Sequence, residues 1–226
     1  MINKDIHYIK KLIAEGEHQQ LDFKFEISDS RKIAKTLVAF ANTNGGVLLI
    51  GVKDNGNIAG VRSEEEFYMV EAAANLYCKP KIEFQVRKWT VEGKAVLEVT
   101  IPKSEKLPCL AEVEPKKWLA FIRVDDENIL ANNIHMKVWK KRHQKKGIFI
   151  EFSDKEKLLL QYLEINPIIS MPRFCKVAMI TKRAAENILA NLITLGLIEM
   201  VYSDQHFSYR LSKEKTPEPS RLSGFM

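Results

Sequence analysis

The segment 21–61, LDFKFEISDSRKIAKTLVAFANTNGGVLLIGVKDNGNIAGV, constrains the fold of this chain more than any other part of the sequence. Apolar and charged residues alternate over 21–25, which predicts a strand with one apolar face. Apolar residues then recur at helical spacing until the Asn-Gly-Gly at 44–46, where glycine ends the helix because it adopts the left-handed conformation at little cost. The apolar run 47–52 predicts a buried strand, and the Asn-Gly at 55–56 is a strong hairpin signal.

The rest of the N-terminal part continues this mixture of helices and strands. The expected elements are a helix at 5–15, a helix that starts near Ser63, strands at 82–91, 95–101 and 118–124, and a basic helix at 132–146. This order indicates the α+β class, with helices packed on a mixed sheet. The first domain is therefore expected to span residues 1–146, with the basic helix as its last element.

A second domain is expected over residues 150–212. Ser153 and Glu156 have the spacing of a capping box at a helix start, and two further helices follow, the last of them capped by Thr181. Three helices followed by a small hairpin is the order of a winged helix-turn-helix. The run ITKRAAENILANLITLGLIEMVYSDQHFSYRL resembles the recognition helix and wing of many bacterial regulators. Residues 213–226, rich in serine, proline and charge, are expected to form a flexible tail.

Several short motifs of the first domain also resemble a known family. They are Gly-Glu at 16–17, Asp-Phe-Lys at 22–24, Ala-Asn-Thr-Asn-Gly-Gly at 41–46, Gly-Val-Lys-Asp-Asn-Gly at 51–56 and Phe-Ile-Arg-Val at 121–124. Together they resemble the Alba-like (AlbA-2 type) domain of the Schlafen group, which is found in bacterial proteins described as DNA-binding regulators. The resemblance covers roughly residues 5–140 and implies an Alba-like fold of helices on a mixed sheet.

The resemblance also implies a candidate enzymatic site, because some eukaryotic Schlafen relatives are RNA endonucleases that use three carboxylates in this domain. The matching positions are Glu17, Asp22 and Asp54, which would hold Mg²⁺ or Mn²⁺. Aspartate stands at position 22 where the family usually has glutamate, and Lys53 replaces an aspartate of the motif. The alternative is that Glu17 and Asp22 form ion pairs with Lys24 or Arg123. No cofactor is expected apart from that metal.

The charge of the chain favours an anionic partner, since its formal net charge is +6 and its isoelectric point is near 9.1. The candidate nucleic-acid contacts are Lys24, Arg31, Lys32, Lys35, Lys53 and Arg123 in the first domain, Lys140, Lys141 and Arg142 in the basic run 135–147, and Lys182, Arg183 and Asn187 on the third C-terminal helix. Lys182 and Arg183 suit phosphate or guanine, and Asn187 suits adenine. A solvated linker helix could also explain the basic run, and a protein-contact helix could explain the third helix.

Other features exclude several classes of protein. No apolar run approaches the roughly 20 residues needed to cross a bilayer, and the N-terminus has no apolar signal core. Cys78, Cys109 and Cys175 are far apart in sequence and suit a reducing cytosol. No Cys-x-x-Cys or His-x-x-x-His spacing is present, so a structural zinc site is not expected. The chain is therefore expected to be cytoplasmic, with no membrane partner.

Three functions remain open at this point. The first is a transcriptional regulator that binds DNA, in preference to RNA, through the winged helix, and that forms a homodimer to read paired half-sites. The second is a metal-dependent RNA or single-stranded DNA endonuclease. The third is an oligomerising adaptor that uses both domains for protein contacts.

Overall fold

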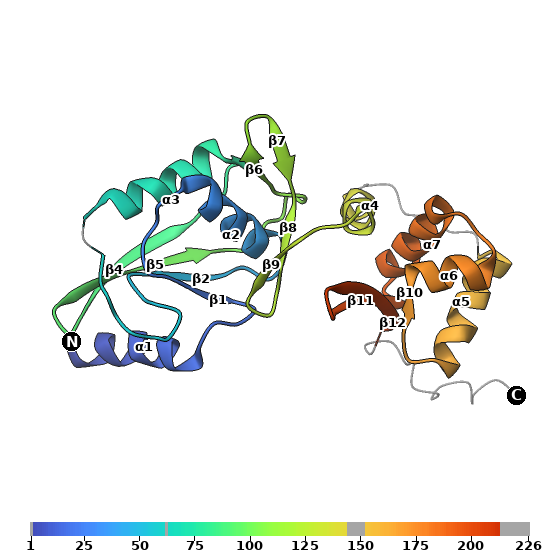
Figure 1. Ribbon diagram of the computed structural model, residues 1–226, viewed down its shortest axis with the longest axis horizontal. Coiled ribbons are helices and arrows are strands. Elements are labelled where there is room, and N and C mark those ends of the chain that lie inside the picture. Colours follow the sequence, from blue (N-terminus) through green and yellow to red (C-terminus); the bar gives the residue numbers. More distant parts are fainter. Residues whose placement is uncertain (1, 62, 144–151, 213–226) are drawn as a thin grey trace, which may run out of the picture. The chain divides into compact units, whose positions relative to one another are not determined.

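A computed structural model describes residues 2–61, 63–143 and 152–212, and it separates the chain into two compact units, 1–131 and 132–226 (Figure 1). The expected tail at 213–226 lies outside the described residues, and so do Lys145 and Lys146 of the basic run. Both units mix helices with strands, as the sequence predicts for the α+β class. No helix in the described ranges is long and apolar enough to span a bilayer.

The first unit is built on a four-stranded sheet in the order β1-β2-β5-β4. β1 and β2 are parallel, and the remaining neighbours are antiparallel. A second sheet has the order β3-β6-β7, and β8 and β9 form a separate hairpin. The elements are α1 (Ile2–Glu15), β1 (Leu21–Lys24), α2 (Ser30–Asn42), β2 (Gly46–Ile50), α3 (Glu65–Leu76), β3 (Cys78–Lys79), β4 (Gln85–Val91), β5 (Lys94–Ile101), β6 (Leu110–Glu114), β7 (Lys117–Leu119), β8 (Phe121–Val124) and β9 (Glu127–Leu130).

Helices cover both faces of the four-stranded sheet. In Figure 1, α1 lies on one face, and α2 and α3 lie on the other. β2 shows why this sandwich forms, because Leu48 and Ile50 belong to the core with α2 and α3, whereas Leu49 belongs to the smaller core with Ile9 of α1. A strand buried on both faces reads as a continuous apolar run, which is the pattern that the sequence has at 47–52.

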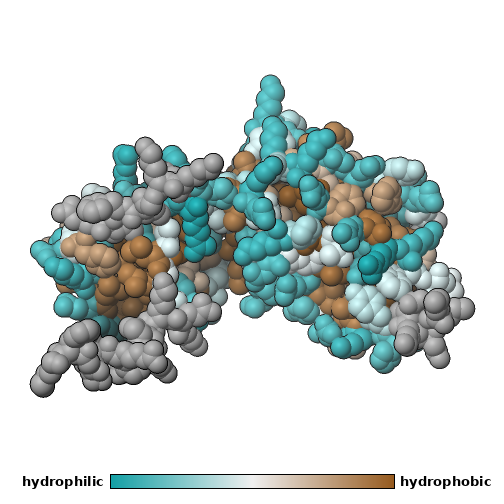
Figure 2. Space-filling model, turned by 180° about the vertical axis from the view of Figure 1, so that it is seen from behind, coloured by the Kyte–Doolittle hydropathy of each residue, from teal (hydrophilic) through white to brown (hydrophobic). Residues whose placement is uncertain are grey.

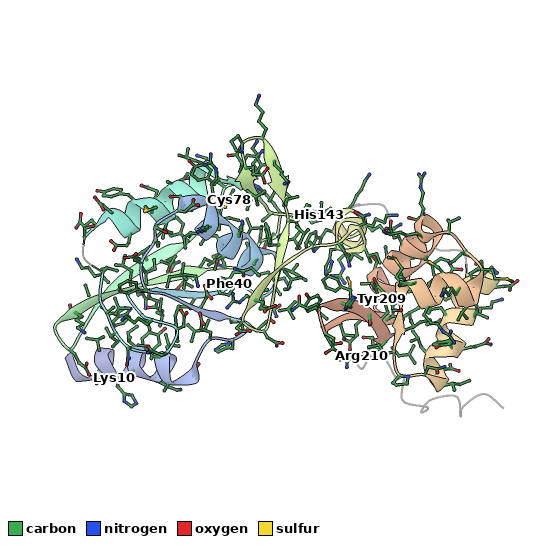
Figure 3. All side chains as sticks on the ribbon, in the orientation of Figure 1. Lys10, Phe40, Cys78, His143, Tyr209 and Arg210 are labelled. Atoms are coloured by element: carbon green, nitrogen blue, oxygen red, sulfur yellow. The ribbon has the colours of Figure 1, made fainter. Side chains whose placement is uncertain are left out.

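Residues 40–46, at the end of α2, contact the core of the sheet, the backbone at Cys109 and Phe121, and the end of β5 at Ile101. Phe40, labelled in Figure 3, is fully buried in the core shared with the sheet. Asn42 is buried too; its Nδ2 donates to the carbonyl oxygens of Cys109 (2.9 Å) and Phe121 (2.8 Å), and its Oδ1 accepts from the amide of Cys109 (2.8 Å). Gly45 then turns the chain at φ +71°, where a Cβ would lie 2.7 Å from the carbonyl oxygen of Ile101.

The second unit contains four helices and a three-stranded sheet in the order β10-β12-β11, counted over its described residues. Its elements are α4 (Asn133–Arg142), α5 (Asp154–Ile165), β10 (Ile169–Ser170), α6 (Met171–Ala178), α7 (Lys182–Thr194), β11 (Ile198–Ser203) and β12 (His206–Leu211). Hydroxyl caps begin three of these helices, Ser153 on α5, Ser170 on α6 and Thr181 on α7, and the sequence predicts those at Ser153 and Thr181.

α4 corrects the expected place of the basic helix. The sequence pattern predicts that this helix is the last element of the first domain and ends at residue 146. Instead, Ile134 and Val138 of α4 lie in the same core as Ile188 and Leu192 of α7. The compact units divide between Ala131 and Asn132, so α4 is the first element of the second unit. The apolar side chains of α4, and not its charge, therefore determine the unit in which this helix packs.

Gly45 provides a test of the helix stop. We expect Gly45→Ala to lower the free energy of unfolding by about 2 kcal/mol or more, because the added methyl group meets backbone atoms at a left-handed position. Gly93 has a similar φ of +75°, but no atom lies within 4 Å of the place that a Cβ would take, so Gly93→Ala isolates the conformational cost. The Gly93→Ala control is expected to lower the free energy of unfolding by about 1 kcal/mol. Urea denaturation of the two variants gives the comparison, and equal losses would contradict the proposed close contact.

Candidate nucleic-acid interface

Two of the three candidate carboxylates come together at the start of β1. Glu17 lies in the turn after α1, and its Oε1 accepts a hydrogen bond of 2.8 Å from the amide of Phe23. Burial raises the pKa of Glu17; the Phe23 amide opposes this rise, and the neighbouring Asp22 carboxyl adds to it. Glu17 and Asp22 are therefore close enough to interact.

The Asp22 carboxylate forms ion pairs with two basic side chains, which agrees with the alternative interpretation of this residue. Its Oδ1 lies 3.0 Å from Arg123 Nη2, and its Oδ2 lies 2.7 Å from Lys24 Nζ. The contact with Lys24 is an ion pair without hydrogen-bond geometry, since Oδ2 has no hydrogen-bond partner. Asp22 is 3% exposed, so both cations compensate a buried charge.

Asp54 does not join the other two carboxylates. It is exposed in the turn after β2, between the bridge partners Val52 and Ile58. Within the described parts of the chain, no group of three or more histidine, cysteine or carboxylate residues is arranged to hold a metal ion. The side chains that the resemblance assigns to Mg²⁺ or Mn²⁺ therefore do not fit that role together in this arrangement.

Arg123 is a correction to the expected basic surface. Its charge predicts an exposed phosphate contact, but the residue is 2% exposed. Its guanidinium donates to Asp22, to the Leu21 carbonyl oxygen (3.3 Å) and to Asn128 Oδ1 (3.1 Å). Its position within the apolar strand Phe121–Val124 is the sequence signal that points to burial. Arg123 serves the fold and is not available to a ligand.

The other basic residues of the first unit are only partly displayed. Lys32 is exposed on α2, whereas Arg31 and Lys35 are half-buried. The Arg31 guanidinium lies 4.7 Å from the centre of the Tyr77 ring, and the Lys35 ammonium lies 5.9 Å from that of Phe121. Lys53 is exposed beside Phe25, at 5.4 Å from the ring centre. These side chains are dispersed over α2 and the hairpin after β2, so they form no compact cationic site.

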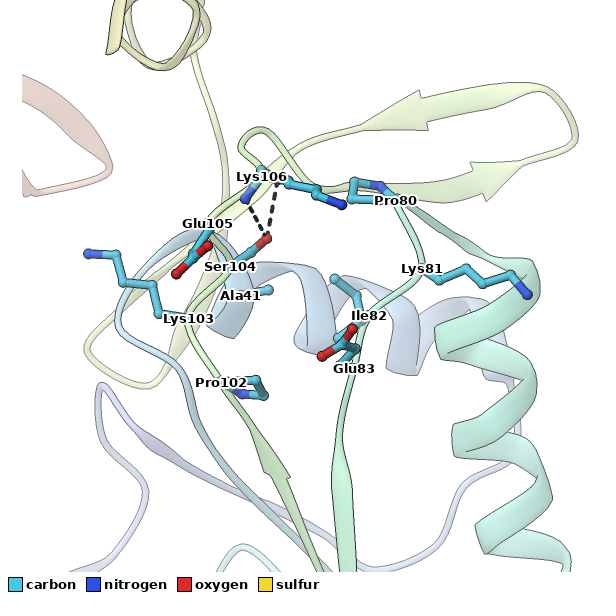
Figure 4. A pocket seen from close by; sticks show the side chains of 10 residues that line it. All are labelled: Ala41, Pro80, Lys81, Ile82, Glu83, Pro102, Lys103, Ser104, Glu105 and Lys106. Atoms are coloured by element: carbon cyan, nitrogen blue, oxygen red, sulfur yellow. Dashed lines mark hydrogen bonds between the residues drawn. The ribbon is translucent and has the colours of Figure 1, made fainter. Parts of the chain in front are cut away.

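A hollow of about 350 Å³ in the first unit lies between the loops at 80–83 and 102–106. Figure 4 shows that Lys81 and Lys103 point away from it in opposite directions. The Ser104 hydroxyl inside the loop is hydrogen-bonded to the backbone of Lys106 at 3.1 and 3.2 Å. Lys81 and Lys103 therefore do not converge on a single anion in this hollow.

The second unit displays its cations more openly. Lys182 and Arg183 are exposed in the first turn of α7, as expected. Arg173 and Lys176 are exposed on α6, and they are not among the contacts expected from the sequence. Among the ion pairs of the described residues, none involves these four side chains. Their spacing off the apolar stripe of α6 is the signal that could have identified Arg173 and Lys176.

The last turn of α4 adds three more cations to the second unit, Lys140, Lys141 and Arg142. Lys140 and Arg142 are exposed and Lys141 is half-buried. Figure 2 shows that hydrophilic side chains dominate the described surface in the view from behind, with hydrophobic areas between them.

Glu186 is the one acidic side chain on α7, and it packs against α4 instead of facing solvent. It is 7% exposed and is bound by two residues of α4, with Asn133 Nδ2 at 3.3 Å and Lys137 Nζ at 3.2 Å. Burial alone would raise the pKa of Glu186, but the hydrogen bonds from Asn133 and Lys137 and the charges of Lys137 and Lys182 lower it. Its negative charge is therefore satisfied inside the unit and does not oppose an anion at Arg183.

The buried pair of Asp22 and Arg123 gives a stability prediction. Arg123→Met leaves the Asp22 carboxylate with Lys24 alone and is expected to lower the free energy of unfolding by about 3–5 kcal/mol. Lys117→Met is the control, because it breaks an exposed pair with Glu114 that is worth about 0–1 kcal/mol. Adding Asp22→Asn to Arg123→Met should restore part of the loss. Urea denaturation of all variants measures these differences, and a loss for Arg123→Met no greater than that for Lys117→Met would contradict the assignment.

Two solved structures are similar to the chain at low sequence identity. The DIP2311 protein from Corynebacterium diphtheriae is 17% identical over 93% of this chain and 38% of that chain, with a TM-score of 0.47. The N-terminal domain of a RecG-related protein from Nitrosomonas europaea is 18% identical over 64% of this chain and 97% of that domain, with a TM-score of 0.34. The chain thus spans well under half the length of the DIP2311 protein, and at these TM-scores neither likeness fixes its fold.

No curated protein matches the chain. A family model described as Schlafen, AlbA_2 matches residues 17–132, which is more than half of the chain and includes the segment from β1 to β2 together with the hairpin of β8 and β9. The chain therefore belongs to the Schlafen, AlbA_2 family.

Proposed function

We propose that this protein binds nucleic acid, and that it binds double-stranded DNA through α6 and α7 of its second unit. The observation that carries the proposal is the display of Arg173, Lys176, Lys182 and Arg183, four exposed cations that form no ion pair with other described residues. Cations of this kind neutralise phosphates and release counterions, which is the main source of affinity for duplex DNA. Membership of the Schlafen, AlbA_2 family agrees with a nucleic-acid partner.

The second unit is best interpreted as a winged helix-turn-helix. α5, α6 and α7 are followed by the hairpin of β11 and β12, and β10 pairs with β12. In this interpretation α7 is the recognition helix, which enters the major groove with its N-terminal residues, and the hairpin is the wing. DNA is favoured over RNA because the major groove of an RNA duplex is too narrow for side chains to read.

The biological role that fits this interpretation is transcriptional regulation by a homodimer. A dimer of winged helices reads two half-sites about one helical turn apart, so the target would be a repeated or palindromic sequence. The oligomerising adaptor is the competing role. It would assemble as concentration rises but show no affinity for duplex DNA at low salt.

The test of the DNA interface is a double substitution at the start of α7. We expect Lys182→Ala with Arg183→Ala to weaken duplex binding by tenfold or more at low salt, as about 1–3 kcal/mol is lost per specific arginine contact. The slope of log K against log salt should also fall by about one for each lost phosphate contact. Fluorescence anisotropy with a labelled duplex over a salt series measures both quantities.

The matched control removes the same charge from another helix of the same unit. Lys155→Ala with Lys157→Ala changes α5, where Lys157 is exposed and lies 3.7 Å from Asp154. This variant should keep the salt slope of the wild type. Equal losses in both double variants would show that only net charge matters, and unchanged affinity in the α7 variant would exclude α7 as the DNA-binding helix.

A metal-dependent endonuclease is the second candidate function. The closeness of Glu17 and Asp22 favours it, since paired carboxylates are a recurrent feature of metal-assisted phosphate chemistry. The ion pairs of Asp22 and the separate position of Asp54 weigh against it. We therefore place this activity behind DNA binding.

Incubation of the purified chain with labelled RNA and single-stranded DNA in Mn²⁺ tests the nuclease directly. If Glu17 takes part, Glu17→Gln should reduce cleavage by a factor of about 100 or more, on the order of the loss from removing one catalytic group. Asp125→Asn is the control, since Asp125 is exposed in the turn between β8 and β9. Cleavage that continues in Glu17→Gln would rule out this site.

A further inference from the structure

One amide on the exposed side of α7 is already held by a residue of α4. Asn187 is exposed, and its Oδ1 accepts a hydrogen bond of 2.6 Å from Lys137 Nζ. The same ammonium lies 3.2 Å from Oε2 of the buried Glu186. Lys137 is thus fixed by acceptors on two successive residues of α7, and 29% of its side chain is exposed. This contact is a defined part of the surface that α7 presents.

The exposed part of α7 is a narrow strip. Residues four apart share one face of a helix, which places the exposed Arg183 and Asn187 in a row with Asn191, which is half-buried with its Oδ1 enclosed. Glu186 and Ala190 are buried on one side of this row, where α4 packs, and Ala185, Ile188, Leu189 and Leu192 are buried in the core of the unit. Asn187 lies in the middle of the strip that remains. A base edge that lies one turn beyond Arg183 along α7 therefore passes close to this amide.

The contact with Lys137 fixes which way the amide of Asn187 faces. An ammonium group has three donors and no acceptor, so only Oδ1 can face it favourably. A flipped amide would direct its NH₂ group at the ammonium and lose the hydrogen bond. Nδ2 is consequently the atom that Asn187 turns outward, and it offers two hydrogen-bond donors.

This orientation changes what Asn187 can recognise. Asparagine reads adenine with both amide atoms, since Oδ1 accepts from N6 while Nδ2 donates to N7. Oδ1 keeps a second lone pair, but it is directed at Lys137 on α4, so Nδ2 is the amide atom that is turned toward a base. Guanine presents two acceptors in the major groove, O6 and N7, and matches a side chain that turns only its donor toward the base. Arg183, one turn earlier on the same strip, is also of the type that most often contacts guanine.

We propose that Lys137 is a specificity-determining residue, which restricts Asn187 to donating and so makes α7 select guanine rather than adenine at the base that Asn187 faces. This inference rests on the proposed function, in which α7 lies in the major groove. It replaces the adenine preference that the residue type alone suggests for Asn187. The side chain that sets the preference belongs to a different helix from the one that reads the base.

The test is selection of bound sites from a randomised duplex library by the full-length chain. The wild type should enrich guanine at one position of the site, and Asn187→Ala should remove that preference. Lys137→Met removes the ammonium and frees Oδ1, so the ratio of adenine to guanine at this position should rise on the order of tenfold. Lys157→Met, which removes one charge from α5, should leave the ratio unchanged.

The substitution at Lys137 also leaves Glu186 with Asn133 as its remaining partner among the hydrogen bonds and ion pairs of the described residues, which could unfold the unit. Lys137→Met combined with Glu186→Gln removes that buried charge and still frees Asn187, so the same rise in adenine is expected. An unchanged ratio in a folded variant of either kind would overturn the inference while leaving DNA binding in place. Failure of the wild type to bind any duplex would overturn the inference together with the proposed function.

Discussion

The first unit depends on one buried ion pair, between Asp22 and Arg123. Asp22 belongs to β1 of the four-stranded sheet, and Arg123 belongs to β8 of a separate hairpin, so the pair joins two pieces of β structure that share no ladder. The backbone amide of Arg123 donates to Thr43 Oγ1 at 2.9 Å, which adds the end of α2 to the same junction. A buried pair adds little stability over an apolar contact of equal shape, but it penalises any arrangement in which one charge loses its partner. The placement of β8 against β1 is therefore tightly constrained.

The same junction limits the chemistry that the first unit can perform. A carboxylate that compensates a buried arginine and a neighbouring lysine has little negative potential left for a metal ion. Glu17 is beside it, yet the Phe23 amide already occupies Oε1 of Glu17. The family motif that contains these residues thus has a structural use in this chain, as does Asn42 of the Asn-Thr-Asn-Gly-Gly segment. This is why the proposed function rests on the second unit, where the cations of α6 and α7 face outward.

Local patterns in the sequence predict most of the helices and strands, but few of the contacts between residues that are far apart in the chain. The strand, helix and strand between Leu21 and Ile50 follow from periodicity and glycine, because those signals act within one or two turns of chain. The charge of Arg123 wrongly predicts an exposed side chain, and its pairing with Asp22 is only one of two alternatives that the sequence leaves open, because the two residues lie about a hundred positions apart and only the folded chain brings them together. The assignment of α4 to the first domain is wrong for a related reason. The sequence shows the charge of this helix, but it does not show which core Ile134 and Val138 pack into. The burial of Glu186 by a helix that precedes it in the chain had no local signal at all.

Both units contain a buried carboxylate paired with a cation, but the two ion pairs have different consequences. Each buries a carboxylate that a cation from another element compensates, Asp22 with Arg123 and Glu186 with Lys137. Arg123 is enclosed and uses a planar guanidinium with several fixed hydrogen bonds, so this pair can act only as a structural link. Lys137 is partly exposed, and an ammonium on a flexible chain keeps a free donor beyond the one that Glu186 takes. That donor reaches Asn187, and for this reason a contact that stabilises the packing of α4 on α7 also orients a side chain at the surface.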